Sequence, residues 1–265
     1  MLPYRATIGC VIDPGLDGKT VLVTGGAMNI GAAISRAFAA QGARVAVHYV
    51  GGVSPDGTQE HRRVADDDVE RFVASLPGAV AVEADFLEPG SASGLFDRVH
   101  DLLGGVDVLV NNAAYATEAD TFATMDDAGL ERTYRVNAIA PAMLIAELSS
   151  RLRDDGSAAV VNISTDAARG FPGQVGYGTS KAALESLTRG AALDLGPRIR
   201  VNAIAPGPVQ TGWMTDEIVE SVVPSIPLRR VGDPDDIADA AVFLASRQAR
   251  WITGQVVQVA GGHWL

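Results

Sequence analysis

Residues 20–31 read TVLVTGGAMNIG, a short apolar run that passes directly into a glycine-rich turn and then into an alanine-rich helix. Backbone N–H groups at such a turn lie at the positive end of the helix dipole, where a pyrophosphate can bind. Gly25 would allow the tight turn, and Gly31 would allow close packing of the helix. Asn29 stands where another glycine is expected, and asparagine tolerates a positive φ. The spacing departs from G-x-G-x-x-G, so a plain structural turn is the alternative for this motif alone.

The alternation of a short apolar run with a longer helical segment continues along the chain. Runs rich in Val and Ile are predicted to be strands covered on both faces: Thr20–Thr24, Arg44–Tyr49, Ala79–Glu83, Val106–Val110, Ala158–Ser164, Ile199–Ile204 and Gln255–Val259. Segments with helical spacing include Ile30–Gln41, Val69–Leu76, Gly176–Leu195 and Asp235–Ala245. The order predicts an α/β fold, a single-domain Rossmann-like doubly wound parallel sheet of about seven strands flanked by helices. Residues 1–19 are expected to be an N-terminal extension of the domain 20–265.

Composition restricts the classes of function. The chain has 265 residues, 47% of them hydrophobic and 20% charged, so it can bury a large core. Its net charge of −11 argues against nucleic acid or an anionic membrane as a partner, because both require a dense basic face. Cys10 is the only cysteine, which excludes an intrachain disulfide and a thiolate metal cluster. The start of the chain lacks a signal-peptide pattern and no apolar run is long enough to span a bilayer, so a cytoplasmic protein is expected.

Tyr177 and Lys181 lie four residues apart in a predicted helix and therefore share one face. A free tyrosine has a pKa near 10 and is a poor acid–base group at neutral pH. A nearby lysine cation favours the phenolate and is expected to lower that pKa toward the working range. The alternative, for this pair alone, is an amphipathic helix that happens to carry both residue types.

Further motifs surround this pair. Asn111-Asn112-Ala113-Ala114 ends the fourth predicted strand, Asn137 lies in a helical stretch, Val160-Val161-Asn162-Ile163-Ser164-Thr165 precedes the Tyr–Lys helix, and Pro206-Gly207-Pro208-Val209-Gln210-Thr211 follows the sixth strand. Together, and in this order from about Thr20 to Gly262, they resemble the short-chain dehydrogenase/reductase family. The sequence is similar to its 3-oxoacyl-thioester reductases and pteridine-reductase-like members.

The resemblance implies roles for individual residues. Tyr177 would be the general acid/base that protonates a carbonyl oxygen or deprotonates an alcohol. Lys181 would lower the pKa of that tyrosine and hydrogen-bond the nicotinamide ribose, and Asn137 would hold a water of a proton relay. A hydroxyl on the fifth strand would steady the substrate oxygen.

Two residues are candidates for that hydroxyl. The family's strand pattern places Thr165 at the serine position, whereas the commonest family spacing of thirteen residues before Tyr177 points to Ser164. Neighbouring strand residues face opposite sides, so only one of them fits the role. A loop shortened by one residue is easier to tolerate than a strand slipped in register, which favours Thr165.

The resemblance also implies a dinucleotide site. The aspartate that binds the adenine amino group would be Asp85, the adenine ribose would lie near Asn112 and Ala113, and the nicotinamide amide near Val209 and Thr211. The full set of expected cofactor-binding residues is Gly25, Met28, Asn29, Ile30, Gly31, His48, Tyr49, Asp85, Phe86, Asn112, Ala113, Ala114, Tyr177, Lys181, Pro206, Gly207, Val209 and Thr211.

The end of the second strand bears on the choice between NAD and NADP. Tyr49 occupies the place where NAD-preferring members carry a carboxylate that accepts from the ribose 2′-hydroxyl. The basic residue common in NADP-preferring members is replaced by Met28. Arg62 and Arg63 either fold back over a 2′-phosphate or form a solvated helix start. NADP(H) is expected over NAD(H). His48 has no partner at ligand spacing, so no metal site is expected.

The expected activity is reversible hydride transfer between nicotinamide and a small-molecule carbonyl or secondary alcohol. Residues 212–230 would form a substrate lid by family analogy, with Trp213 and Met214 as the candidate substrate contacts. The apolar side chains of that segment either meet a hydrophobic substrate or simply cover the core. The alternative functions are a cofactor-retaining lyase or epimerase and a non-catalytic dinucleotide-binding regulator. Family members commonly form tetramers, so a homotetramer or homodimer is expected.

Overall fold

Parallel strands form one sheet in the part of the chain that the computed structural model describes, residues 12–52, 63–117, 120–212 and 214–264. The strands are β1 (Thr20–Val23), β2 (Arg44–Tyr49), β3 (Val80–Glu83), β4 (Val108–Asn111), β5 (Ala158–Ile163), β6 (Ile199–Pro206) and β7 (Val256–Val259). Their order in the 7-stranded sheet is β3-β2-β1-β4-β5-β6-β7. The predicted strands and their parallel pairing are confirmed.

Helices connect the strands and end close to the predicted positions. They are α1 (Asn29–Ala40), α2 (Asp66–Ala74), α3 (Ser91–Leu103), α4 (Asp127–Tyr134), α5 (Ala140–Arg151), α6 (Val175–Leu195), α7 (Asp216–Val222) and α8 (Pro234–Ala245). Helix α2 begins earlier than predicted because three aspartates, Asp66–Asp68, form its first turn, where the helix dipole favours negative charge. Within the described ranges, no helix is both long enough and apolar enough to cross a membrane.

Short segments of other helix types complete the connections. A π-helical segment, η2 (Arg135–Ile139), joins α4 to α5. The 3₁₀ segments are η3 (Asp166–Arg169) after β5, η4 (Val223–Ser225) after α7 and η5 (Arg247–Ala249) after α8.

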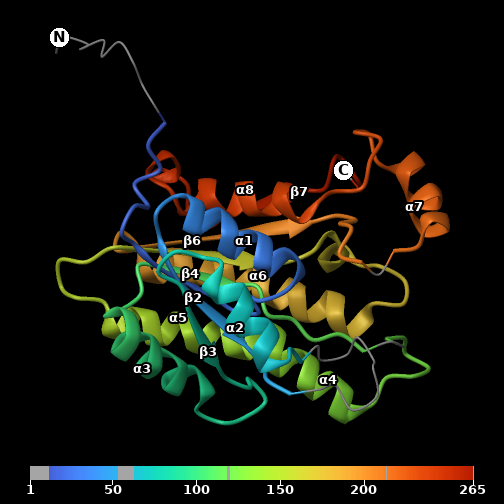
Figure 1. The fold of residues 1–265 in the computed structure, drawn as a ribbon. Helices are drawn as coiled ribbons and strands as arrows, with labels where there is room; N and C mark the ends of the chain where they lie inside the picture. The colour runs from blue at the N-terminus through green and yellow to red at the C-terminus, as the bar shows by residue number, and fades with distance from the viewer. Residues whose placement is uncertain (1–11, 53–62, 118–119, 213, 265) are drawn as a thin grey trace.

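Two hydrophobic cores form on the two faces of the sheet. Leu22 of β1 packs into the same core as Leu144 of α5, whereas its neighbour Val23 belongs to the core that contains Ile34 of α1 and Ile237 of α8. Successive strand residues point to opposite faces, so a continuous apolar run is required for a strand covered on both sides. Figure 1 shows α1 and α8 on one side of the sheet and α3 and α5 on the other.

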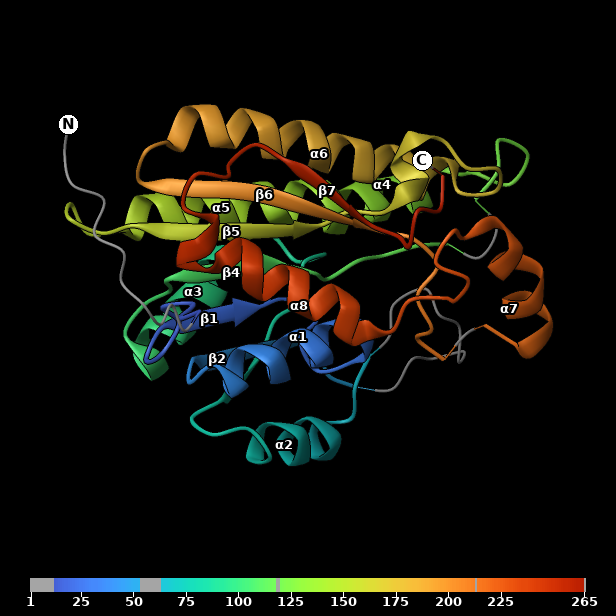
Figure 2. The same ribbon diagram turned by 90° about the horizontal axis from the view of Figure 1, so that it is seen from above.

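The strand order reverses between β1 and β4. From β1 the chain builds outward through β2 to β3, and it then returns to β4 and builds outward in the opposite direction to β7. A crevice forms at the carboxyl ends of strands where such a reversal occurs, and ligands of open α/β sheets bind there. The glycine-rich turn after β1 and the Asn111–Ala114 segment after β4 both lie at this point. Figure 2 shows α7 projecting beyond these strand ends.

Candidate active site

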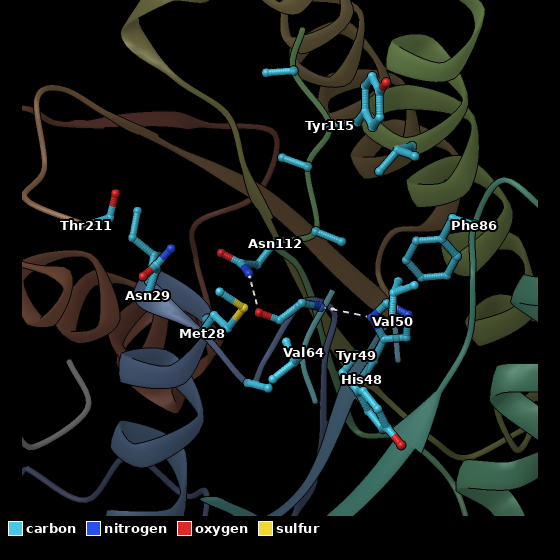
Figure 3. A pocket seen from close by; sticks show the side chains of 18 of the residues that line it. Met28, Asn29, His48, Tyr49, Val50, Val64, Phe86, Asn112, Tyr115 and Thr211 are labelled. Atoms are coloured by element: carbon cyan, nitrogen blue, oxygen red, sulfur yellow. Dashed lines mark hydrogen bonds between the residues drawn. The ribbon is translucent and has the colours of Figure 1, made fainter. Parts of the chain in front are cut away.

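A cavity of about 410 Å³ opens at the switch point of the sheet. It is lined by most of the residues predicted to bind a cofactor: Gly25, Met28, Asn29, Ile30, Gly31, His48, Tyr49, Phe86, Asn112, Ala113, Ala114, Tyr177 and Thr211 (Figure 3). Lys181, Pro206, Gly207 and Val209 line an adjoining cavity instead. Asp85 is not part of either lining, whereas Val50, Val64, Tyr115 and Val136 line the first cavity without having been predicted.

The turn between β1 and α1 has the backbone conformation that its residues allow. Gly25 adopts a φ of 59° and Asn29 a φ of 48°, in the left-handed region that glycine and asparagine tolerate best. A Cβ on Gly31 would lie 2.0 Å from the carbonyl oxygen of Gly25, so only glycine fits there. The amide of Asn112 donates to that same oxygen at 3.1 Å, which ties the turn to the end of β4.

The N-terminus of α1 meets the requirement for a phosphate site. Among the described residues, the N-cap residue Met28 provides no side-chain cap, and the first turn lines the open cavity. The first N–H groups of a helix have no intrahelical partner and carry a partial positive charge. An uncapped helix start facing a cavity therefore fits the pyrophosphate of a dinucleotide.

His48 holds this turn in place, a role that the sequence does not reveal. The side chain is 1% exposed, its Nδ1 accepts from the Gly25 backbone N–H at 2.9 Å, and its Nε2 lies 2.9 Å from the Ala84 carbonyl oxygen. A backbone N–H only donates and a carbonyl only accepts, so the imidazole carries its proton on Nε2. The ring also stacks on Phe86, with centroids 4.5 Å apart. Figure 3 shows the bond between Gly25 and His48.

Tyr49, at the end of β2, lines the cavity beside a group of carboxylates. Burial raises the pKa of its phenol, and the negative charges of Asp66 and Glu83 raise it further. Tyr49 therefore stays protonated and neutral at the position where the family's NAD-preferring members carry a carboxylate.

One of the two arginines predicted near this place lies beside the end of β2. The Nη1 atom of Arg63 donates to the carbonyl oxygen of Gly51 at 2.9 Å, and Nη2 lies 3.4 Å from Asp85. The Arg63 side chain is 37% exposed, so part of its charge faces solvent. Arg62 lies outside the described residues.

Tyr177 and Lys181 lie together on the first two turns of α6. Lys181 donates from Nζ to the Ile163 carbonyl oxygen at 2.8 Å, and the same nitrogen lies 5.8 Å from the centre of the Tyr177 ring. Asp120 fixes the start of this helix, because its two carboxylate oxygens accept from the backbone N–H groups of Gly176 and Tyr177, each at 2.7 Å. The predicted pairing of phenol and ammonium on one helix face is present, and Asp120 is a positioning residue that the sequence pattern misses.

Burial changes the titration of both groups. It raises the pKa of Tyr177 to about 12, with a further contribution from the negative charge of Asp166. Burial lowers the pKa of Lys181 to about 8. The sequence predicts a tyrosine pKa lowered by lysine, and the direction of this prediction is wrong for the protein alone. Desolvation penalises the charged form of each group, which raises the pKa of the phenol and lowers that of the ammonium.

Asn137 is fully buried within the π-helical segment η2. Its amide oxygen accepts from the backbone N–H of Tyr115 at 2.8 Å, and its Nδ2 donates to the Tyr115 carbonyl oxygen at 2.8 Å and to Ser180 Oγ at 3.0 Å. Asn137 thus joins the loop after β4 to the helix that carries Tyr177. The π-helical geometry was not predicted.

The two candidate hydroxyls differ in their surroundings. Ser164 is 3% exposed, and its Oγ donates to Glu185 Oε1 of α6 at 2.8 Å. Thr165 caps η3, with Oγ1 accepting from the Ala167 N–H at 3.2 Å. Both residues line the adjoining cavity together with Tyr177. The hydroxyl of Ser164 is thus hydrogen-bonded to a partly buried carboxylate.

The adjoining cavity has a volume of about 360 Å³ and lies on the side of Tyr177 away from β2. Its wall combines apolar side chains of the segment around α7 with residues between β5 and α6 and with His263 after β7: Met214, Ile218, Val222, Thr165, Asp166, Phe171, Gln174 and His263. Met214, one of the two predicted substrate contacts, is buried and lines this cavity, and Trp213 lies outside the described residues. In the described ranges, no group of His, Cys, Asp and Glu side chains is arranged to hold a metal ion.

Comparison with known proteins gives a consistent result. A family profile described as enoyl-(acyl carrier protein) reductase matches residues 25–263. An uncharacterized oxidoreductase of Mycobacterium tuberculosis (strain CDC 1551 / Oshkosh) is 38% identical over 257 residues, which cover 93% of this chain and 92% of the relative. A short-chain dehydrogenase/reductase of the glucose/ribitol dehydrogenase type from Brucella melitensis superposes with a TM-score of 0.81 and 29% identity, covering 94% and 98% of the two chains. A blue fluorescent protein from a metagenomic library, solved in complex with NADPH, superposes with a TM-score of 0.84 and 33% identity, covering 94% and 99%.

Proposed function

Because the chain belongs to the short-chain dehydrogenase/reductase family and is an NAD(P)-dependent oxidoreductase, we propose that it interconverts a carbonyl compound and a secondary alcohol with NADP(H). Tyr177 carries the proposal, since its side chain lines both cavities. One cavity ends at the uncapped start of α1 and fits a dinucleotide. The other has apolar side chains on one wall and fits a small organic substrate.

The proposed reaction assigns a proton transfer to Tyr177. When bound, the nicotinamide supplies a hydride to the substrate carbon or accepts it. In the reductive direction, the Tyr177 hydroxyl gives its proton to the carbonyl oxygen. A pKa of about 12 keeps this hydroxyl protonated at neutral pH, as a general acid requires. Lys181, held by the Ile163 carbonyl oxygen, lies where its charge favours the phenolate that forms.

We assign the substrate-orienting hydroxyl to Thr165. Its Oγ1 lies on the wall shared with Tyr177 and caps η3, and a hydroxyl both donates and accepts. The competing hydroxyl of Ser164 donates to Glu185 at 2.8 Å, whereas the hydroxyl of Thr165 donates over the longer distance of 3.4 Å to Asp166 Oδ1. Asn137 is proposed as the residue that orders the path from Lys181 toward solvent, in keeping with its place between Tyr115 and Ser180.

NADP(H) is the proposed cofactor rather than NAD(H). Tyr49 provides no carboxylate to repel a 2′-phosphate, and the Arg63 guanidinium lies beside the end of β2. The NADPH complex of the metagenomic blue fluorescent protein supports the same choice. The 2′-phosphate would then lie near Arg63, and the ionic contact would favour NADPH by charge.

Residues 212–230 are proposed as the substrate lid, because Met214 and the α7 residues Ile218 and Val222 form one wall of the second cavity.

A homotetramer or homodimer is also proposed. Large apolar side chains are exposed on helices and on the segment before β7, among them Leu193 at 87% and Trp251 at 96%. Such side chains are typical of association surfaces. Sedimentation velocity measures the assembly, and a purely monomeric species would reject this part of the proposal.

Titration with NADPH and NADH tests the function first. Wild type and Tyr49→Asp are compared by thermal shift and nicotinamide fluorescence, because a ligand that binds only the native state raises its stability according to its Kd. NADPH is expected to bind wild type more tightly, and Tyr49→Asp is expected to reverse the order. A panel of ketones and aldehydes then follows nicotinamide absorbance. Net oxidation of NADPH supports the reductase, whereas turnover without net absorbance change would indicate a lyase or epimerase that retains its cofactor.

A further inference from the structure

Asp166 and His263 form a buried pair that the proposed hydride transfer leaves unused. His263 Nδ1 lies 2.6 Å from Asp166 Oδ2, and the two side chains are 5% and 11% exposed. Both line the second cavity together with Tyr177. Two polar side chains of this kind are costly to bury unless they are hydrogen-bonded, which makes their presence beside the apolar part of the wall informative.

The backbone on both sides holds Asp166 and His263 in position. Asp166 begins η3 directly after Thr165, while His263 follows two glycines whose φ angles, 61° and 87°, turn the chain back toward the cavity. A Cβ on Gly262 would lie 2.7 Å from Pro227 Cγ, so this turn packs tightly on the segment after α7. Arg169 donates to the carbonyl oxygen of Trp264, which fastens the end of the described chain onto η3.

The pair leaves one ring nitrogen available. Asp166 accepts a hydrogen bond from Nδ1–H of His263, and in an imidazole that carries its proton on Nδ1 the other nitrogen, Nε2, is a hydrogen-bond acceptor. Among the described residues, none forms a hydrogen bond with His263 Nε2. This nitrogen is also not among the polar atoms that are fully buried without a partner, so part of its surface is accessible. With the ring on the cavity wall, its free acceptor is accessible from the cavity.

We propose that Asp166 and His263 form a subsite for a hydroxyl group of the substrate, at a distance from the carbonyl that Tyr177 protonates. This inference rests on the proposed function and narrows its substrate to hydroxylated ketones or aldehydes, or to the corresponding diols. A hydroxyl donates to Nε2, while the Asp166 carboxylate behind the ring strengthens that acceptor and disfavours an anionic substituent. The apolar side chains Phe171, Met214 and Ile218 on the rest of the wall would contact the carbon skeleton.

Matched ketone pairs test the subsite. The probes are hydroxycyclohexanones and methylcyclohexanones substituted at carbon two, three or four, assayed with NADPH on wild type, His263→Leu and the control His100→Leu. His100 is exposed on α3, outside both cavities. At one ring position or more, His263→Leu is expected to raise the KM ratio of hydroxy to methyl substrate about tenfold, the effect of one lost hydrogen bond, whereas His100→Leu is expected to leave the ratio as in wild type. An equal change for both members of all three pairs would overturn the subsite while the reductase assignment stood.

A binding measurement separates this inference from the proposed function. The ¹⁵N resonance of His263 Nε2 is followed in wild type with NADP⁺ bound, as each hydroxycyclohexanone or its methyl counterpart is added. A shift with a hydroxy compound alone supports the subsite even if no ketone in the panel is reduced, in which case the proposed function fails and the subsite does not. The same measurement decides the matter if His263→Leu fails to fold. No shift with any hydroxy compound would overturn the proposal.

Discussion

Nδ1 of His48 accepts a 2.9 Å hydrogen bond from the backbone N–H of Gly25, the residue at which β1 turns toward α1. The other ring nitrogen donates to the carbonyl oxygen of Ala84 at the end of β3. One buried side chain therefore connects three strand ends. The N–H of Gly25 points inward to this ring, whereas the first turn of α1 lines the first cavity.

His48→Leu is expected to weaken NADPH binding about tenfold. Leucine has no acceptor for the Gly25 N–H, so the turn between β1 and α1 is held less firmly. His48→Asn is the matched control, since an amide carries one acceptor and one donor at a similar reach. Nicotinamide fluorescence gives the Kd of each variant. Equal affinity of His48→Leu and wild type, or of His48→Asn and His48→Leu, would contradict the idea that the hydrogen bond between Gly25 and His48 supports cofactor binding.

Thr165→Ala is expected to lower kcat about 100-fold, the usual loss when one donor to a reacting oxygen is removed. Thr165→Ser retains the hydroxyl and is expected to recover most of the activity. Ser164→Ala leaves Glu185 without a buried donor, so it is expected to lower the free energy of unfolding by about 1 kcal/mol with a smaller effect on kcat. Steady-state kinetics and thermal melts of the three variants decide the assignment. The reverse ranking of the two alanine variants in kcat would move the role to Ser164.

Asp166→Asn is expected to shift the pH profile of alcohol oxidation to lower pH. In the proposed reaction, oxidation requires the Tyr177 phenolate, so the rate is expected to rise with pH as that group loses its proton. The negative charge of Asp166 helps to raise the Tyr177 pKa to about 12, and removing it lowers the pKa while burial remains. The logarithm of kcat/KM is followed against pH, with Asp101→Asn on the exposed face of α3 as control. A rising limb that stays in place, or moves to higher pH, would refute the coupling.

Lys181→Met is expected to flatten the pH dependence of stability. In the folded protein the lysine pKa is lowered to about 8 from its ordinary 10.5, so between these values the unfolded chain binds more protons and the wild-type free energy of unfolding rises with pH. Methionine has no such titration, so its stability advantage below pH 8 should shrink by a few degrees of Tm as the pH approaches 10. Thermal melts of both proteins across this range measure the difference. A constant difference would mean that Lys181 titrates normally.

The sequence predicts the sheet well because each strand is covered on both faces. A strand such as Ala158–Ile163 opens with four consecutive apolar residues, and such a run is visible without any knowledge of tertiary contacts. The turn between β1 and α1 can also be predicted from the sequence, because Gly25 and Asn29 are residue types that adopt a positive φ readily. These local signals locate the switch point and most of the cavity wall.

The positioning contacts are not visible in the sequence, because they join residues far apart along the chain. Asp120 caps α6 across 56 positions, and Asp166 meets His263 across 97. No periodicity marks either partner. The direction of the Tyr177 pKa shift is missed for a related reason: it depends on how completely the fold excludes water, and spacing on a helix carries no information about that.

The π-helical segment Arg135–Ile139 determines the direction in which the side chains of the following helix, α5, point about the helix axis. Each residue of an α-helix advances the chain by about 100°, and a π turn accommodates one residue more than an α turn over the same rise. Deleting a single residue between 135 and 139 would leave a smoother helix, yet it would rotate Asn137 away from Tyr115 or turn the buried face of α5 out of its core. The π turn therefore lets one continuous helix place Asn137 against Tyr115 and, further along, turn the apolar face of α5 into its core. A redesign that regularised this helix for stability would sacrifice the alignment of one or the other.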